Sequence, residues 1–204
     1  MTTLVWFQRD LRVTCHPGVN RAIELQSPIV AVYIHSPSED SPWSSGSASN
    51  WWLHQSLEAL SLKLQSLGIE LQLFNSDSQV LIPKIVKHYG IRNVIWTDRH
   101  EPFRHAHENA LEEKLCNSGV QVERFRDELL VDPRNFVTVK SQTPYRVFTP
   151  FYKRLRGELD YSGVETYQSK LPGNLVLSHP ESLTLPGLGL LDAKPWHEKL
   201  HLYW

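Results

Sequence analysis

Short apolar runs alternate along the first 125 residues with segments in which apolar residues return at helical spacing. Each short run predicts a strand. A run that is apolar throughout, such as PIVAVYI, is typical of a parallel strand that is buried on both faces. The predicted strands are 3–7, 28–34, 70–74, 93–96 and 121–125.

Two helices are predicted before the third strand. Pro17 suits the first turn of a helix at about 17–25. A second helix begins where Ser47 or Ser49 can cap it and stops at Gly68. Its leucines repeat at steps of four and three, which places one face against the sheet: Leu53, Leu57, Leu60, Leu64 and Leu67.

Two further helices follow the third and fourth strands. One begins at Asp77 or Ser78 and ends at Gly90, and the other runs from about 104 to 117, before Gly119. The residues expected to face inward are Leu81, Ile85 and Tyr89 in the first of these helices, and Ala106, Ala110, Leu111 and Leu115 in the second.

Strand and helix alternate in this region, which indicates βαβ units and a doubly wound, five-stranded parallel sheet of Rossmann-like α/β class. Ligands bind such sheets beyond the carboxyl ends of the strands. Function is therefore expected in the loops that begin at Gln8, His35, Asn75 and Thr97.

The rest of the chain lacks this alternation. We assign residues 1–130 to the α/β core, 131–170 to a segment that closes the domain, and 171–204 to an extended connector. Prolines interrupt the connector, and no persuasive apolar period runs through it. These prolines are Pro172, Pro180, Pro186 and Pro195.

Composition narrows the classes of function. The chain is 41% hydrophobic with a net charge of −1, which argues against intrinsic disorder and against nucleic-acid binding by bulk charge. No apolar run approaches the length of a membrane helix, and we expect no signal peptide. Cys15 and Cys116 suffice neither for a disulfide framework nor for a metal set, and a reducing cytoplasm fits them.

The first strand–helix turn, FQRDLRV, holds charged residues where a dinucleotide-binding protein has glycines. No glycine precedes Gly18, and no phosphate-binding P-loop occurs. Arg9, Asp10 and Arg12 stand there instead. Either they form an ion pair that pins the loop, or they present a fixed cation to an anionic or carbonyl-rich ligand.

Two other loops carry candidate binding residues. The loop 35–49 holds seven serines and leads into Trp51 and Trp52, which either pack in the core or line a flat aromatic ligand. The loop 97–108 is rich in charge and histidine, but its histidine spacing matches no zinc pattern, so we expect no metal. Motifs for nucleophilic and thiol catalysis are missing. The residues alone predict a binding domain for a flat or polar small molecule, without a catalytic residue.

Four stretches, in this order and spacing, resemble the DNA photolyase and cryptochrome family. They are LVWFQRDLRV, WSSGSASNWWLHQSLEAL (43–60), the EP pair in WTDRHEPF (96–103) and YRVFTPFYKRLR (145–156), whose VFTPF motif closes the α/β domain of these proteins. PWHEKLHLYW (195–204) resembles the linker that precedes their helical domain. The likeness covers nearly the whole chain.

This resemblance implies that the chain is the antenna-binding first domain of a class I cyclobutane pyrimidine dimer photolyase. In the complete protein, a helical domain beyond Trp204 would bind FAD, and light-driven electron transfer from reduced FAD would repair damaged DNA. The FAD-binding helical domain is absent from this chain, so the segment alone should repair nothing. A cryptochrome photoreceptor without repair activity is the alternative, and a standalone nucleotide-binding module is a third.

The resemblance also implies where the antenna pigment binds. The pigment would be 8-hydroxy-5-deazaflavin, a flavin nucleotide or methenyltetrahydrofolate. Phe103 and Arg104 stand where some folate-binding members carry Asn-Glu, which favours a deazaflavin or flavin, and an empty pocket is also consistent with the sequence. The matching positions are Arg9, Asp10, His35, Ser36, Pro37, Asp98, Arg99 and Glu101.

Overall fold

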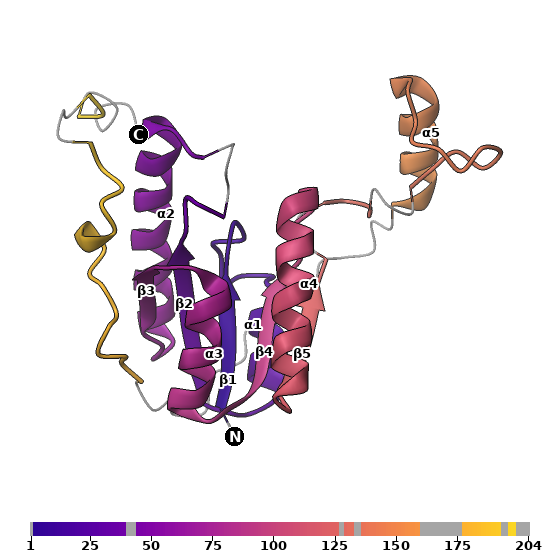
Figure 1. Ribbon diagram of the computed structural model, residues 1–204. Helices are drawn as coiled ribbons and strands as arrows, with labels where there is room; N and C mark the ends of the chain where they lie inside the picture. Colours follow the sequence, from indigo (N-terminus) through magenta and orange to yellow (C-terminus); the bar gives the residue numbers. More distant parts are fainter. Residues whose placement is uncertain are drawn as a thin grey trace.

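A five-stranded parallel sheet forms the centre of the structure, a computed structural model that describes residues 2–39, 44–126, 129–132, 136–159, 177–192 and 196–198. Its strand order is β3-β2-β1-β4-β5, and every neighbouring pair is parallel (Figure 1). The predicted fold class is confirmed. The strands are β1 (Thr2–Phe7), β2 (Ile29–His35), β3 (Leu71–Asn75), β4 (Ile91–Thr97) and β5 (Gln121–Phe125).

Helices cover both faces of this sheet, as a doubly wound fold requires. One apolar cluster joins α1 and α2 to one face, and a second cluster joins α3 and α4 to the other. Successive residues of β1 alternate between the two clusters, since Leu4 and Trp6 face one and Val5 and Phe7 the other. The helices of the core are α1 (Pro17–Glu24), α2 (Ser47–Ser66), α3 (Ser78–Tyr89) and α4 (Pro102–Asn117).

Local sequence explains most helix ends. Asp77 caps α3, because its side chain accepts a hydrogen bond from the backbone N–H of Gln79 at 2.7 Å. Gly90 ends α3 with φ at +61°, in the left-handed region that glycine adopts without strain. The prediction that Ser47 or Ser49 caps α2 is wrong: Gly46 is the N-cap, and both serines lie inside the helix.

The inward face of α4 differs from the prediction. Ala106 and Ala110 are exposed, whereas Arg104 and Glu108 are buried with the two predicted leucines, Leu111 and Leu115. The spacing of four, three and four is helical, but two of its four members are charged. Apolar periodicity could not reveal this face, because Arg104 and Glu108 are buried by pairing with other polar groups rather than by packing.

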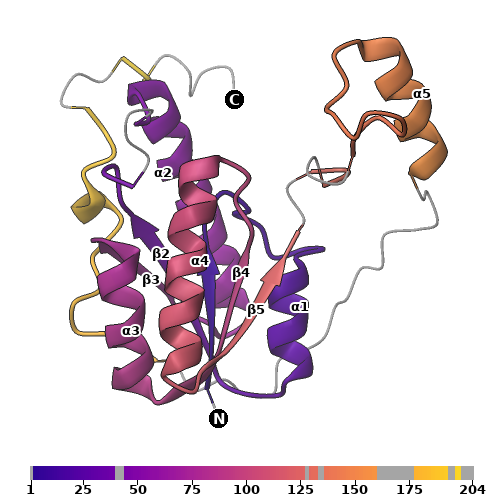
Figure 2. The ribbon, with the colours of Figure 1, turned by 45° about the vertical axis from the view of Figure 1, so that its right-hand side comes forward.

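Beyond β5 the chain forms two parts of different character. Helix α5 (Phe148–Glu158) has no buried residue and stands apart from the sheet (Figures 1 and 2). Residues 177–192, which we call the strap, return to the sheet and run beside β3 (Figure 1). Pro172, Pro195 and the stretch HLYW lie outside the described residues. Of the helices that the structure describes, none combines the length and apolar character needed to traverse a lipid bilayer.

Candidate functional site

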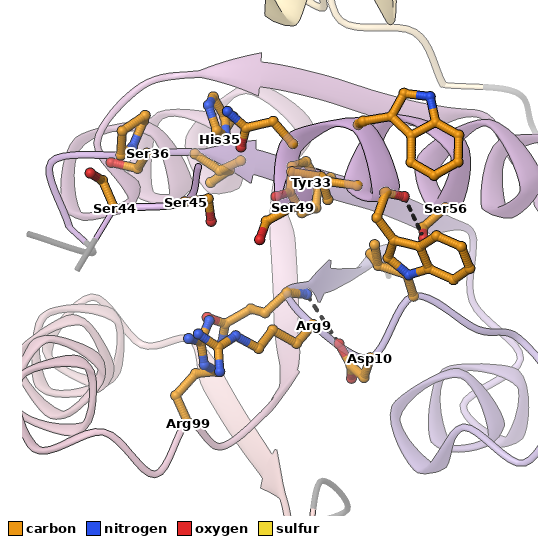
Figure 3. Close-up of a pocket in the computed structure, with 18 of the residues that line it drawn as sticks. Arg9, Asp10, Tyr33, His35, Ser36, Ser44, Ser45, Ser49, Ser56 and Arg99 are labelled. Carbon is orange, nitrogen blue, oxygen red and sulfur yellow. Dashed lines mark hydrogen bonds between the residues drawn. The ribbon is translucent and has the colours of Figure 1, made fainter. Parts of the chain in front are cut away.

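A cleft of about 1120 Å³ opens at the carboxyl edge of the sheet, beside the ends of β1 and β2. The strand order reverses between β1 and β4, so this is the place where doubly wound sheets bind ligands. Its wall is built from the β1–α1 loop, the end of β2, the first half of α2 and the loop after β4. In Figure 3, Arg9 and Arg99 lie on one side and His35, Ser36 and Ser45 on the other.

Six of the eight residues expected to bind a ligand line this cleft. The two that do not are Asp98 and Glu101. Asp98 points instead to β5, where Arg124 Nε donates to its Oδ1 at 2.5 Å. The six lining residues are Arg9, Asp10, His35, Ser36, Pro37 and Arg99.

Asp10 is an anchor for the β1–α1 loop. Its carboxylate accepts hydrogen bonds from the backbone N–H of Gln8 at 3.1 Å and from Thr97 Oγ1 at 2.5 Å, and His16 Nε2 lies 2.7 Å away. Burial raises the pKa of Asp10, but the contacts with His16, Thr97 and Gln8 outweigh it, and the net pKa is lowered. Asp10 therefore stays ionised and ties β1 to β4 across the point where the strand order reverses.

His16 completes this anchor in a defined tautomer. The backbone N–H of Val19 donates to His16 Nδ1 at 3.1 Å, so Nδ1 acts as an acceptor and the ring proton belongs on Nε2, toward Asp10. The same contact caps α1. The loop that carries Arg9 is thus fixed at both of its ends.

Arg9 and Arg99 meet at one carboxylate, that of Glu101. Arg9 Nη1 and Arg99 Nη2 each lie 2.8 Å from Glu101 Oε1. Burial raises the pKa of Glu101, but hydrogen bonds and charge from Arg99, with a smaller contribution from Arg9, lower it to about 2. The pinning ion pair expected near Arg9 is present, with Glu101 rather than Asp10 as the partner. Arg9 is still 64% exposed and stands at the rim of the cleft.

On the α4 side, a buried polar network fills the same sheet edge. Gln8 Nε2 donates to Glu108 Oε1 at 2.8 Å, and Arg104 Nη2 donates to Gln8 Oε1 at 2.7 Å. Arg124, from β5, holds Glu108 at 3.1 Å and Glu112 at 2.7 Å. Burial raises the pKa of Glu108 more than these partners lower it. The network leaves the α2 side as the open part of the edge.

Four residues of this edge were not predicted from the sequence as site residues: Gln8, Arg104, Glu108 and Arg124. Gln8 and Arg104 line the cleft, and Glu108 and Arg124 support them from behind. The available signal was the spacing of Arg104 and Glu108, which lie four residues apart and in line with Leu111 and Leu115. Charged residues in line with the apolar face of a helix indicate a buried ion network.

Tryptophans form the aromatic wall of the cleft. Trp51 is only 8% exposed, whereas its neighbour Trp52 is 58% exposed, and their ring centroids lie 6.2 Å apart. Both line the cleft. Trp51 packs in the protein and also lines the cleft, together with Tyr33 from β2, so the packing alternative holds for Trp51, and contact with a flat ligand stays a prediction.

One group of potential metal ligands comes together among the residues that the structure describes. Glu39, Asp77 and His107 offer ligand atoms within 4.8 Å of one another. These atoms already have partners: Glu39 forms an ion pair with Arg104 and accepts from Ser78, and Asp77 caps α3. Of the three histidines in the loop 97–108, His100, His105 and His107, only His107 belongs to this group.

The lining fits a planar conjugated ligand with a polar or anionic tail. Arginines supply bidentate donors for carboxylate, phosphate or carbonyl oxygens. Serine hydroxyls add hydrogen bonds, and indole faces provide a stacking surface. The cavity volume also suits a cofactor-sized molecule. The lining arginines are Arg9, Arg12, Arg99 and Arg104, and the lining serines are Ser36, Ser44, Ser45, Ser49 and Ser56.

Comparisons with known proteins identify the family and the fold. The family model described as DNA photolyase matches residues 3–172. The chain is 34% identical over 202 residues to a deoxyribodipyrimidine photo-lyase of Agrobacterium fabrum, and 29% identical over 153 residues to cryptochrome-2 of Arabidopsis thaliana. The crystal structure of a bacterial class III photolyase from Agrobacterium tumefaciens matches all of the chain, with a TM-score of 0.85 and 32% identity.

These relatives are much longer than the chain. The alignments cover 98% of the chain but 41% of the photo-lyase, and 74% of the chain but 25% of the cryptochrome. The chain likewise covers 41% of the class III photolyase. It therefore spans about two fifths of the length of the photolyases it matches.

Proposed function

The chain belongs to the DNA photolyase family, and we propose that its carboxyl-edge cleft binds the light-harvesting antenna pigment of a DNA repair enzyme. The observation that carries this proposal is the cleft itself, which is lined by arginines, serines and indoles. The fold is that of the N-terminal domain of photolyases and cryptochromes. A domain of this fold with a cleft of arginines, serines and indoles at its carboxyl edge is suited to hold a pigment.

We assign the six lining residues from the sequence analysis to pigment contact. Arg9 and Arg99 would bind carbonyl or anionic groups of the pigment, and His35 and Ser36 its polar edge. Asp98 and Glu101 would act indirectly, because they hold cations and do not line the cleft. The family binds flavin and antenna pigments, and among the pigments a flavin or deazaflavin remains our preference over a folate.

In its complete form, the protein would be a deoxyribodipyrimidine photo-lyase that repairs cyclobutane pyrimidine dimers by light-driven electron transfer from reduced FAD. The likeness to the Agrobacterium photo-lyase supports this activity. A helical FAD-binding domain and damaged DNA would be its partners. The exposed apolar residues at the start of α5 offer a docking surface for that domain: Val147, Phe148 and Tyr152.

A cryptochrome photoreceptor is the second candidate, supported by the relative from Arabidopsis. The two candidates differ in repair, so illuminating the complete protein with a dimer-containing oligonucleotide separates them. Class I, expected from the sequence, stays a prediction, and the likeness to a class III photolyase supports that class as its competitor.

Pigment binding by the 204-residue chain tests the proposed site directly. Flavin mononucleotide, riboflavin, 8-hydroxy-5-deazaflavin and methenyltetrahydrofolate can each be titrated while pigment absorbance and fluorescence are recorded. Arg9→Ala should weaken binding of the preferred pigment about tenfold, because a charge-assisted hydrogen bond to the ligand is lost. Arg92→Ala, which removes an exposed arginine from the opposite end of β4, is the matched control. Binding of no pigment, or equal loss in both variants, would contradict the assignment.

A further inference from the structure

The strap is fixed to the edge of the sheet by several independent contacts. The backbone N–H of Leu183 donates to the carbonyl of Leu73 in β3 at 2.8 Å, and Ser182 Oγ accepts from the N–H of Leu73 at 3.1 Å. Leu188 and Leu190 are each only 3% exposed and belong to the same apolar cluster as α2. The strap is therefore part of the folded core, although its sequence shows no period.

A histidine secures the amino-terminal part of the strap. His179 is 9% exposed, and its ring lies against Phe74 of β3 and His88 of α3, with centroids at 5.5 and 4.7 Å. The ring contacts of His179, together with Leu183, Leu188 and Leu190, anchor the strap along its length. The strap thus has a defined path along β3 toward the amino-terminal end of α2 (Figure 1).

Just beyond the strap, Trp196 reaches the aromatic wall of the cleft. Its ring centroid lies 6.4 Å from that of Trp51, and its Nε1 donates to Asp192 Oδ2 at 3.2 Å. Trp196 lines the cleft, yet 42% of it is exposed. An indole that served only to pack against Trp51 would bury more of its surface, whereas a half-exposed indole at a cavity leaves a face for a flat ligand.

We propose that Trp196 is a pigment-contacting residue, which the strap carries to the cleft from a part of the chain far from the loops at the strand ends. The proposal rests on the proposed function, since it names a further contact for the same pigment. Trp196 and Trp52 flank Trp51 and supply stacking faces, while Arg9 and Arg99, which line the same cleft, supply the polar contacts.

The test titrates the 204-residue chain with flavin mononucleotide and follows two readouts, the dissociation constant and the residual fluorescence of the bound flavin. Trp196→Ala should weaken binding about tenfold, because loss of one aromatic stacking partner typically has an effect of this size. The bound flavin should also become brighter, because a stacked indole quenches it. Trp196→Phe should restore most of the affinity but little of the quenching, which a purely structural role would not produce.

Two further variants isolate the role of the strap. Leu62→Ala removes an apolar side chain from α2 that is 64% exposed and does not line the cleft, and it should change neither readout. Leu183→Pro removes the donor to Leu73 and should weaken binding through Trp196, so adding it to Trp196→Ala should weaken binding little further.

The outcomes separate this inference from the proposed function. Binding by the wild type with unchanged affinity and quenching in Trp196→Ala would overturn only the role of Trp196. Full additivity of Leu183→Pro and Trp196→Ala would overturn the role of the strap in placing it. If flavin mononucleotide and the other three pigments all fail to bind the wild type, the proposed function and the inference fail together.

Discussion

The two halves of the carboxyl edge differ sharply, although they belong to one sheet. On the α4 side, carboxylates and guanidinium groups from β4, α4 and β5 interlock and are largely buried, with Glu108 at 0% and Asp98 at 6% side-chain exposure. On the α2 side, the same edge opens into a cleft of about 1120 Å³ lined by serines, arginines and indoles. On the α4 side, which we call the sealed half, the polar groups pair with one another. On the α2 side, which we call the open half, they line the cleft and can contact a ligand.

The difference shows that polar residues at strand ends do not by themselves make a binding site. Asp98 and Arg99 are neighbours in the chain, but Asp98 turns to Arg124 whereas Arg99 lines the cleft. Gln8 belongs to both halves, since it donates to Glu108 and also lines the cleft. The sealed half therefore gives the open half a rigid wall, because its groups are held by several partners each.

Removing the central cation of the sealed half should have the largest effect on stability. Arg124→Met leaves Asp98 and Glu108 buried without their cation, and breaking a buried ion pair from one side costs about 4 kcal/mol. Urea unfolding followed by circular dichroism measures this loss. Arg21→Met, on the solvent side of α1, removes a cation that pairs with Glu123 at the surface and should leave the urea midpoint near that of wild type. Equal shifts of the urea midpoint in the two variants would mean that the buried network stabilises the fold no more than a surface ion pair does.

Much of the fold was predictable because apolar spacing decides it. All five strands lie within two residues of their predicted bounds, and the leucine face of α2 packs on the sheet as expected. The error in the inward face of α4 arose because buried polar contacts take the place of apolar packing there. Ala106 and Ala110 were placed inward on α4 because pattern analysis counts Ala as apolar and charged residues as exposed. Pairing partners such as Gln8 lie about 100 residues away, where no local pattern can reveal them.

The candidate site was predictable at the level of loops but not of individual roles. The fold places strand-end loops together, so Arg9, His35 and Arg99 all line the cleft. Which of the neighbouring charges faces the cavity depends on side-chain pairing, and Glu101 pairs with Arg99 and does not line the cleft. The sequence could not predict that Trp196 lines the cleft, because the strap that precedes it has neither strand nor helix periodicity.

Substitutions of the two tryptophans in the open half should affect stability and pigment binding differently. Their effect on stability should be smaller than that of Arg124→Met in the sealed half. Trp51→Ala empties a buried position and should lower the free energy of unfolding by about 3 kcal/mol. Trp52→Ala removes an indole that is 58% exposed and should change it by less than about 0.5 kcal/mol, yet weaken pigment binding. Urea unfolding and flavin titration of both variants provide the comparison. A large loss of stability in Trp52→Ala would show that both tryptophans belong to the core.

Glu101, which joins the two halves, offers the smallest and most local test. Burial raises the pKa of Glu101, but Arg99 foremost and then Arg9 bring it down to about 2 from the ordinary 4.5. Because the folded pKa is the lower one, the unfolded chain binds this proton more readily. The stabilising contribution is complete above pH 4.5 and is lost as the pH falls toward 2.

Carboxyl NMR titration of Glu101 measures this pKa in variants of each arginine. Arg99→Ala should raise it clearly toward 4.5, and Arg9→Ala only slightly, because Arg99 is 5% exposed and Arg9 64% exposed, where solvent screens its charge. The opposite order would mean that the exposed Arg9 holds Glu101 more strongly than Arg99 does. The expected order means that the buried Arg99 fixes Glu101, which leaves Arg9 able to exchange its carboxylate partner for a pigment.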